Sequence, residues 1–274
     1  MTKLPDAEFS QLLTDAKEIA EAAALAGGEV LMKWLGKASV TEKNAGDYVT
    51  QADFESQKTI QALIAKTFPE HDFLGEEDLE TSNDSNTSDF CWIVDPLDGT
   101  TNYIHQMQSF SVSIGLRYRD EMVVGCVYDP MLKEMYIAKR GGGATLNNQP
   151  IRVSGCKDVD RSMIVCSFPR GVQRGAEDFI RFENLICDTR ASVRRLGSAA
   201  LNLCYIACGR LDGYWATALS VWDVAGGAII LEEAGGGLYS IVPGQPFDIE
   251  NPKLLATATP ELFESLKPHM CFET

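Results

Sequence analysis

The chain has 274 residues and a formal net charge of −15. This acidic balance argues against non-specific binding to nucleic acid or to anionic lipid, because both require a basic protein face. Hydrophobic residues make up 45% of the chain and charged residues 23%, which is typical of a globular protein with a substantial core. The sequence contains no run of 18 apolar residues and no signal-peptide pattern in its first twenty residues. We therefore expect a cytoplasmic protein with no nucleic-acid partner and no membrane partner.

The eight cysteines are scattered and form no Cys-x-x-Cys pair. Most of them lie in apolar runs, which predicts reduced thiols in the core of a cytoplasmic protein. Cys204 and Cys208 are four residues apart, as metal ligands on a helix can be, but no nearby histidine or further cysteine completes a site. We therefore interpret both as core residues.

The N-terminal part of the chain is predicted to be helical. Apolar residues recur at helical spacing over residues 8–35 and predict one long amphipathic helix, loosened at Gly27-Gly28. A short strand over 48–50 and a second helix over 51–68 follow. Residues 81–89 are small and polar and predict a surface loop.

The middle of the chain is predicted to be rich in strands. Apolar, alternating or β-branched segments favour strands over residues 90–94, 111–118, 122–128 and 134–138. The last two of these strands are expected to form a hairpin. Asn147-Asn148 then predicts a turn.

After Val153 predicted strands and helices alternate. The strands are expected over 163–167 and 191–196, near Tyr214, and over 254–257; the helices are expected over 176–187, 198–208 and 223–234. Three successive glycines at 235–237 end the last of these helices. The pattern predicts a layered α/β or α+β protein with two lobes, over residues 1–152 and residues 153–274, that form one unit.

The segment from Trp92 to Asn102 carries the most informative chemistry. An apolar strand ends in two carboxylates, Asp95 and Asp98, and Pro96 between them is expected to block further sheet pairing. The Asp98-Gly99-Thr100-Thr101 run has the character of a turn that opens a helix, where backbone N–H groups can bind phosphate oxygens. Mg²⁺ prefers carboxylate and carbonyl oxygens. Asp95 could therefore bridge two Mg²⁺ ions, with the Leu97 carbonyl and the Asp98 carboxylate as further ligands. The alternative is that Asp-Pro-Leu-Asp-Gly is only a good β-turn.

Three further segments place carboxylates at the ends of predicted elements. Glu76 follows a short apolar piece, Asp53 lies at the start of the helix after residue 50, and Asp223 lies at the start of another helix. Each also has a simpler interpretation, as a solvated acidic turn or as a helix N-cap.

Taken together, these motifs resemble the inositol monophosphatase family, part of the lithium-sensitive, magnesium-dependent phosphatase superfamily. The matching motifs are G-E-E at 75–77, W-I-V-D-P-L-D-G-T-T-N at 92–102 and W-D-V-A-G at 222–226, supported by D-Y-V-T-Q-A-D at 47–53 and L-G-S-A-A at 196–200. They span most of the chain. The resemblance implies an α+β fold, a layered α-β-α-β-α sandwich of the inositol monophosphatase and fructose bisphosphatase type, in a homodimer.

The resemblance also implies two to three Mg²⁺ ions in each active site. The implied ligands are Glu76, Asp95 and the Leu97 carbonyl for the first ion, Asp95, Asp98 and Asp223 for the second, and Glu76 again for a weakly held third. Thr100, hydrogen-bonded to Asp53, is implied to help Glu76 activate the attacking water. The resemblance implies that Gly99, Thr100 and Thr101 contact the phosphate. Gly197, Ser198 and Ala199 open a predicted helix and could meet the substrate's hydroxyls or phosphate, and the expected substrate-binding residues also include Asp98 and Asp223. The lobe of residues 1–152 is then expected to carry most metal ligands, and the lobe of residues 153–274 to carry Asp223 and the substrate pocket, in one catalytic unit.

One departure concerns the substrate. Family members that select inositol phosphate carry a glutamate seven residues before the Trp-Asp aspartate, and here that position is Ala216. The expected substrate is a small phosphomonoester, either inositol monophosphate or a related sugar or polyol phosphate. Histidinol phosphate, fructose 1,6-bisphosphate and a nucleotide 3′-phosphate are alternatives, as is a non-catalytic protein that binds metal or phosphate. Arg170, Arg194 and Arg195 are either cations of the pocket or surface charges.

Overall fold

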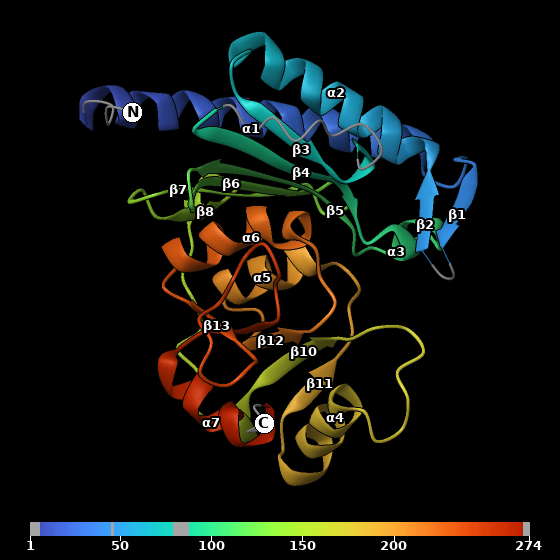
Figure 1. The fold of residues 1–274 in the computed structure, drawn as a ribbon, viewed down its shortest axis with the longest axis vertical. Coiled ribbons are helices and arrows are strands. Elements are labelled where there is room, and N and C mark those ends of the chain that lie inside the picture. Colours follow the sequence, from blue (N-terminus) through green and yellow to red (C-terminus); the bar gives the residue numbers. More distant parts are fainter. Residues whose placement is uncertain (1–5, 45–46, 79–87, 271–274) are drawn as a thin grey trace.

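The computed structural model describes residues 6–44, 47–78 and 88–270 (Figure 1). Most of the predicted loop at 81–89 lies outside this part of the chain. The described residues form five layers, in which helices and sheets alternate. From one end of the molecule to the other, the layers are the helices α1 (Asp6–Trp34) and α2 (Gln51–Thr67), a seven-stranded sheet, the helices α5 (Ala199–Ala207) and α6 (Val221–Glu233), a five-stranded sheet, and the helices α4 (Glu177–Asp188) and α7 (Pro260–Met270). The predicted α-β-α-β-α sandwich is confirmed.

The seven-stranded sheet comes from one continuous stretch of chain. In spatial order its strands are β3 (Asp72–Gly75), β4 (Phe90–Asp98), β5 (Ser111–Tyr118), β6 (Glu121–Asp129), β7 (Glu134–Lys139), β8 (Ala144–Leu146) and β9 (Gln149–Pro150). Only β3 and β4 are parallel. The four predicted strands are confirmed, and the predicted hairpin is β6–β7. Asn147 and Asn148 both have positive φ, as a tight turn between β8 and β9 requires.

The expected loosening of the first helix at Gly27-Gly28 is wrong, because α1 runs unbroken through both residues. A Cβ on Gly27 would lie 2.8 Å from Ile60 in α2, and one on Gly28 would lie 2.6 Å from the Tyr128 ring in β6. The two glycines therefore let α1 approach α2 and the sheet closely. This contact offsets the roughly 1 kcal/mol that each glycine costs inside a helix.

The five-stranded sheet lies on the other side of α5 and α6. In spatial order its strands are β11 (Ser192–Arg194), β10 (Met163–Ser167), β12 (Gly213–Ala216), β14 (Leu254–Thr257) and β13 (Gly237–Ser240). The predicted strands and helices of this half are all present, but β13 and α7 were not predicted. The hairpin of β1 (Val40–Asn44) and β2 (Asp47–Thr50) and the short helix α3 (Thr100–Ile104) complete the elements near the candidate site, together with the 3₁₀ segments Glu76–Asp78 and Val159–Arg161.

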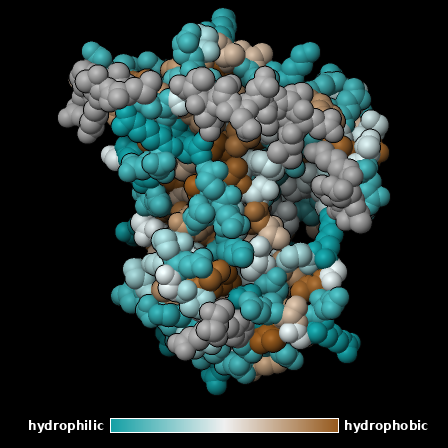
Figure 2. All heavy atoms as spheres, in the orientation of Figure 1, coloured by the Kyte–Doolittle hydropathy of each residue, from teal (hydrophilic) through white to brown (hydrophobic). Residues whose placement is uncertain are grey.

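The two sheets share one core through α5 and α6. A single buried cluster contains Ile93 and Ala138 of the first sheet, Leu203 of α5, Ile230 of α6 and Leu254 of the second sheet. Helix α6 thereby brings Asp223, at its first turn, against the end of β4. Figure 2 shows one face of the molecule, where hydrophilic side chains predominate and hydrophobic ones form small separate groups.

None of the described helices combines the length and the apolar content that crossing a membrane would require. The seven cysteines within the described residues are free thiols, as the sequence predicts. Four of them are buried: Cys91, Cys126, Cys166 and Cys204.

Candidate active site

The candidate site forms where β4 is interrupted by a bulge. Pairing with β5 runs as far as Asp95, which lies opposite Ser113, and resumes at Asp98, which lies opposite Ser111. β4 therefore has one more residue than β5 between these two pairs. The expectation that Pro96 ends the pairing is therefore wrong, because the bulge accommodates the missing N–H and the strand continues. The Ser56 hydroxyl of α2 donates to the Pro96 carbonyl at 3.2 Å and helps to hold the bulge in place.

Three carboxylates converge beside this bulge. One oxygen each from Asp95, Asp98 and Asp223 lies within 4.8 Å of the other two. Asp95 and Asp98 are 1% and 5% exposed, respectively. The simpler interpretation of Asp223 as the N-cap of α6 is wrong, because Ser220 is the N-cap. Asp223 is the third residue of the helix and accepts the Ser220 backbone N–H at 2.6 Å in a capping box, so it can cap α6 and belong to the cluster at once. Carboxylates from two distant segments of the chain thus share one acidic site.

The cluster strongly disfavours its own negative charge. Burial raises the pKa of Asp95 well above its usual range, and the charges of Glu76, Asp98 and Asp223 raise it further. Burial also raises the pKa of Asp98 to about 6 and, with help from the Asp98 charge, that of Asp223 to about 7. Two unit charges 4.8 Å apart repel by about 3 kcal/mol at an effective dielectric of about 20. This set of hard oxygen donors fits a divalent cation such as Mg²⁺, which would remove the repulsion.

Asp98 is fixed by the N-terminus of α5. The Ser198 hydroxyl donates to Asp98 Oδ2, the Ala199 N–H donates to Oδ1 at 3.0 Å, and the Ala200 N–H donates to Oδ2 at 2.8 Å. Ser198 and Ala199 were expected to contact substrate. In the structure the Ser198 hydroxyl and the Ala199 N–H donate to Asp98, since a carboxylate is favoured at a helix N-terminus.

Gly197 is needed for this arrangement. Its φ is +97°, and a Cβ there would lie 2.6 Å from the Asn102 side-chain nitrogen. That nitrogen donates to the carbonyls of Leu196 and Ser109, at 2.7 Å each, and so ties the start of α5 to the segment after α3. Gly197 therefore allows the close packing of two loops.

Glu76 lies next to the cluster without being one of its three members. It follows β3, whose last residue Gly75 pairs with Val94, the neighbour of Asp95. After burial, the charge of Glu76 raises the pKa of Asp95 more than the charges of Asp98 and Asp223 do. Its carboxylate does not join the group whose oxygens lie within 4.8 Å of one another among the described residues.

The expected hydrogen bond between Thr100 and Asp53 is not formed. The Thr100 hydroxyl donates to the Leu97 carbonyl at 3.1 Å. Asp53 Oδ2 accepts the backbone N–H of Thr50 at 2.9 Å and its hydroxyl at 2.6 Å. Each side chain has thus found a partner three residues away, in a local turn or capping box. Burial raises the pKa of Asp53 to about 7.

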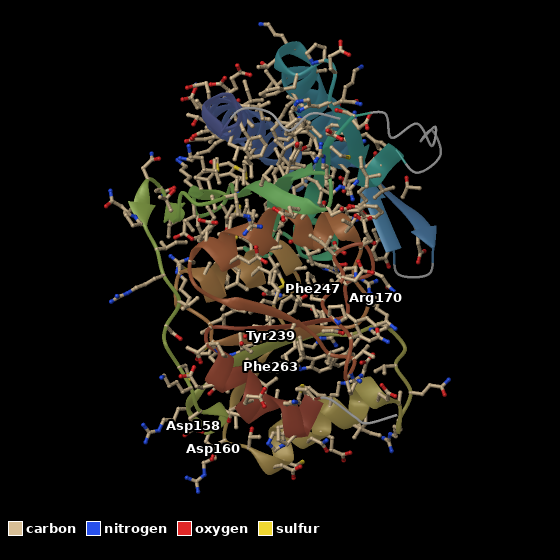
Figure 3. All side chains as sticks on the ribbon, turned by 60° about the vertical axis from the view of Figure 1, so that its left-hand side comes forward. Asp158, Asp160, Arg170, Tyr239, Phe247 and Phe263 are labelled. Atoms are coloured by element: carbon tan, nitrogen blue, oxygen red, sulfur yellow. The ribbon has the colours of Figure 1, made fainter. Side chains whose placement is uncertain are left out.

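Arg170 is a cation that sequence reasoning left open and that the structure places beside the start of α3. Its guanidinium donates to the Thr101 hydroxyl at 2.5 Å and lies 5.6 Å from the centre of the Tyr48 ring. It extends from the loop between β10 and α4 (Figure 3). By contrast, Arg194 donates to the adjacent Val193 carbonyl, and Arg195 lies over the Phe168 ring at 4.1 Å.

A cleft of about 710 Å³ lies at the opposite end of β4, beside Cys91. Its three arginines already face carboxylates: Arg117 pairs with Glu250, Arg119 with Asp89 at 3.1 Å, and Arg140 with Glu232 at 2.8 Å. A phosphate would have to displace these ion pairs. The acidic cluster at the other end of the strand is therefore the stronger candidate site.

Comparison with known proteins gives consistent relatives. The model of the inositol monophosphatase family matches residues 12–273. The chain is 36% identical over 260 residues to Nus factor SuhB of Pseudomonas aeruginosa, covering 92% of this chain and 96% of that one. It is 39% identical over 253 residues to inositol-1-monophosphatase of Synechocystis, covering 90% and 86%. The solved inositol monophosphatase of Anabaena superposes with a TM-score of 0.80 at 37% identity, covering 94% and 95%.

Proposed function

The chain belongs to the inositol monophosphatase family, and from this membership we propose that it is a Mg²⁺-dependent hydrolase of small phosphomonoesters. The observation that carries the proposal is the convergence of Asp95, Asp98 and Asp223 within 4.8 Å of one another. A family fold without this cluster would support only a binding role. The cluster also explains how a chain of net charge −15 can bind phosphate, because bound cations supply the positive charge.

In this proposal Asp95, Asp98 and Asp223 hold the metal ions, and Glu76 and the Leu97 carbonyl complete the ligand set for two to three Mg²⁺. The Leu97 carbonyl accepts the Thr100 hydroxyl with one of its two lone pairs, which leaves the other for a metal. When bound, the ions supply positive charge that stabilises the charge developing on the phosphate. Glu76, at the edge of the cluster, is the group that accepts a proton from the attacking water.

The phosphate is proposed to lie at the start of α3. Gly99 has φ +94° and makes no side-chain cap, and a Cβ there would lie 2.9 Å from the Ser109 carbonyl. The first N–H groups of a helix have no partner within it, so those of Gly99, Thr100 and Thr101 are suited to phosphate oxygens. Arg170, held on the Thr101 hydroxyl, adds positive charge at the same place.

Thr100 and Asp53 act indirectly in this proposal, through the residues that they position. The Thr100 hydroxyl orients the Leu97 carbonyl. Asp53 caps α2 through Thr50, and α2 in turn holds the Pro96 carbonyl through Ser56. Ser198 and Ala199 contribute by fixing Asp98, and Gly197 contributes by allowing α5 to start where it does.

The substrate is proposed to be inositol monophosphate or a related sugar or polyol phosphate, with relaxed selectivity. Ala216, at the end of β12, is fully buried and carries no group that can bind a hydroxyl. A pocket without a carboxylate at this position lacks a hydrogen-bond acceptor for substrate hydroxyls, so it should discriminate less between one polyol phosphate and another. A homodimeric, cytoplasmic and lithium-sensitive enzyme remains part of the proposal.

The proposal is tested by phosphate release from a panel of phosphomonoesters. The panel includes inositol monophosphate, glycerol phosphate, histidinol phosphate, fructose 1,6-bisphosphate and a nucleotide 3′-phosphate, each assayed with Mg²⁺ and with EDTA. We expect Mg²⁺-dependent release of phosphate, and the substrates are ranked by kcat/KM. Asp95→Asn should abolish the release, while its circular dichroism spectrum remains that of a folded protein. Release from none of these substrates by the wild type would favour the non-catalytic alternative instead.

A further inference from the structure

A pair of buried polar side chains lies behind the carboxylate cluster, between α5 and β12. Asn202 and Tyr214 are both 0% exposed. Neither polar atom of Asn202 nor the Tyr214 hydroxyl has a hydrogen-bond partner of normal geometry within the described part of the chain. A buried polar group without a partner costs about 1–3 kcal/mol, and native proteins rarely leave such groups unsatisfied. A pair of this kind therefore requires an explanation.

The position of Asn202 links the pair to Asp98. Asn202 lies one helical turn after Ser198, so the two side chains share a face of α5. Ser198 is the residue whose hydroxyl donates to Asp98. The polar face of α5 that fixes Asp98 thus continues inward to Asn202, and Figure 1 shows α5 in the layer between the two sheets.

Tyr214 faces the same region from β12. Its hydroxyl lies near the side chains of Ser167 and Asn202, and the charges of Asp98 and Asp223 act on it electrostatically. Burial, followed by those two charges, raises its pKa above the usual range, so the hydroxyl keeps its proton and is a donor. Ser167 is half-buried at the end of β10, opposite Ala216. A polar track therefore runs from Ser167 through Tyr214 and Asn202 toward the carboxylates.

We propose that Asn202 and Tyr214 are positioning residues that hold Asp98 and Asp223 in their metal-binding arrangement through ordered water. The inference rests on the metal site of the proposed function. Asn202 offers two donors and an acceptor, and Tyr214 offers a donor, so water between them and the carboxylates would satisfy both sides at once. Groups that orient metal ligands in this way typically change metal affinity by 10- to 100-fold when removed.

A purely structural role is the competing explanation, and another unpartnered group shows the contrast. Trp215 Nε1 is also buried without a partner among the described residues. It belongs to a different core cluster, which includes Leu262 and Leu266 of α7, on the other side of the second sheet. Unlike Trp215, the Asn202–Tyr214 pair lies near Asp98 and Asp223.

The test compares Tyr214→Phe with Tyr136→Phe. Tyr136 is a buried tyrosine in the same core cluster, and its hydroxyl bonds to Glu134 at 2.7 Å and to Arg210 at 2.9 Å. Melting temperatures are measured in EDTA and over a Mg²⁺ titration, which gives an apparent Mg²⁺ dissociation constant without any substrate. We expect Tyr214→Phe to raise that constant at least 10-fold and to keep its melting temperature in EDTA. Tyr136→Phe should leave the constant within about twofold and lower the melting temperature.

Asn202→Ala is the second variant, and the same weakening of Mg²⁺ binding is expected. Equal Mg²⁺ dissociation constants in the wild type, Tyr214→Phe and Asn202→Ala would overturn this inference alone. A wild-type melting temperature that does not respond to Mg²⁺ would overturn the metal site of the proposed function, and this inference with it. The two failures are therefore distinguishable.

Discussion

Magnesium should stabilise this protein much more at pH 8 than at pH 5. The folded-state pKa values of Asp98 and Asp223, about 6 and about 7, exceed the ordinary value of 3.8. A carboxyl group with a raised folded-state pKa contributes stability that is complete below about pH 4 and is lost as the pH rises through the folded-state pKa. Without metal, these groups therefore make the fold less stable at pH 8 than at pH 5.

The size of the effect follows from the shifts. At 1.36 kcal/mol per pKa unit, ionising Asp98 costs up to about 3 kcal/mol and ionising Asp223 up to about 4 kcal/mol of folding stability. The Asp98 charge contributes to the shift of Asp223, so the two costs overlap. Mg²⁺ at 100 times its dissociation constant adds about 2.7 kcal/mol. For a chain of this length, that corresponds to a rise of roughly 5–10 °C in melting temperature.

The assay is thermal unfolding followed by circular dichroism at pH 5 and at pH 8, in EDTA or MgCl₂, with KCl matching the ionic strength. At pH 5 protons occupy most of the Asp98 and Asp223 carboxyls, so the Mg²⁺ shift should largely disappear. Asp95→Asn is the matched variant, because an amide oxygen can still accept the Leu97 N–H that Asp95 accepts at 2.9 Å. In EDTA at pH 8 it should melt at or above the wild type, and it should lose the Mg²⁺ shift. An equal Mg²⁺ shift at both pH values would refute the reasoning.

Three further predictions concern the surroundings of the cluster. Ser198→Ala removes the hydroxyl donor to Asp98, so the Mg²⁺ concentration for half-maximal activity should rise about 10-fold. An unchanged Mg²⁺ concentration for half-maximal activity would contradict a role of Ser198 in positioning Asp98. Gly197→Ala should lower the free energy of unfolding in urea by about 1–3 kcal/mol, and by more than Gly141→Ala, because Gly141 shares the positive φ but a Cβ added to it would have no atom within 4 Å. Arg170→Gln should raise KM several-fold with little change in kcat. Arg194→Gln is the control, because the Arg194 guanidinium donates to the carbonyl of its neighbour Val193, and it should leave KM unchanged. Equal effects of the two substitutions would rule out the phosphate contact of Arg170.

The sequence predicts the candidate site better than its surroundings. Asp95 and Asp98 stand out because an apolar run over 90–94 is followed by a turn-like motif, and both leave local signals. The structure places that motif in a bulge of β4. The strands β8 and β9 have three and two residues, which is too short for a periodic pattern. Helix α7 contains Pro268, a residue that usually argues against a helix interior.

Contacts between distant segments were not predictable in the same way. Ser198 and Ala199 were expected to face substrate, yet their donors bind Asp98, a hundred residues earlier in the chain. Nothing local in Gly-Ser-Ala distinguishes a helix start that binds a ligand from one that binds a side chain. Likewise, Thr100 and Asp53 each had a local hydrogen-bond partner, which competes with the long-range bond that the family resemblance implied.

The unequal support of the carboxylates indicates which one depends most on a cation. Asp98 accepts three donors from the N-terminus of α5, and these donors hold its pKa down to about 6 against the effect of burial. Asp95 is buried as well, and it accepts the Leu97 N–H while it faces the charges of Glu76, Asp98 and Asp223. Protein donors thus offset much of the cost of ionising Asp98, whereas Asp95 depends more on a bound cation. A carboxylate with so little protein support is suited to bridge two cations, because each cation it binds removes part of the repulsion that its neighbours impose.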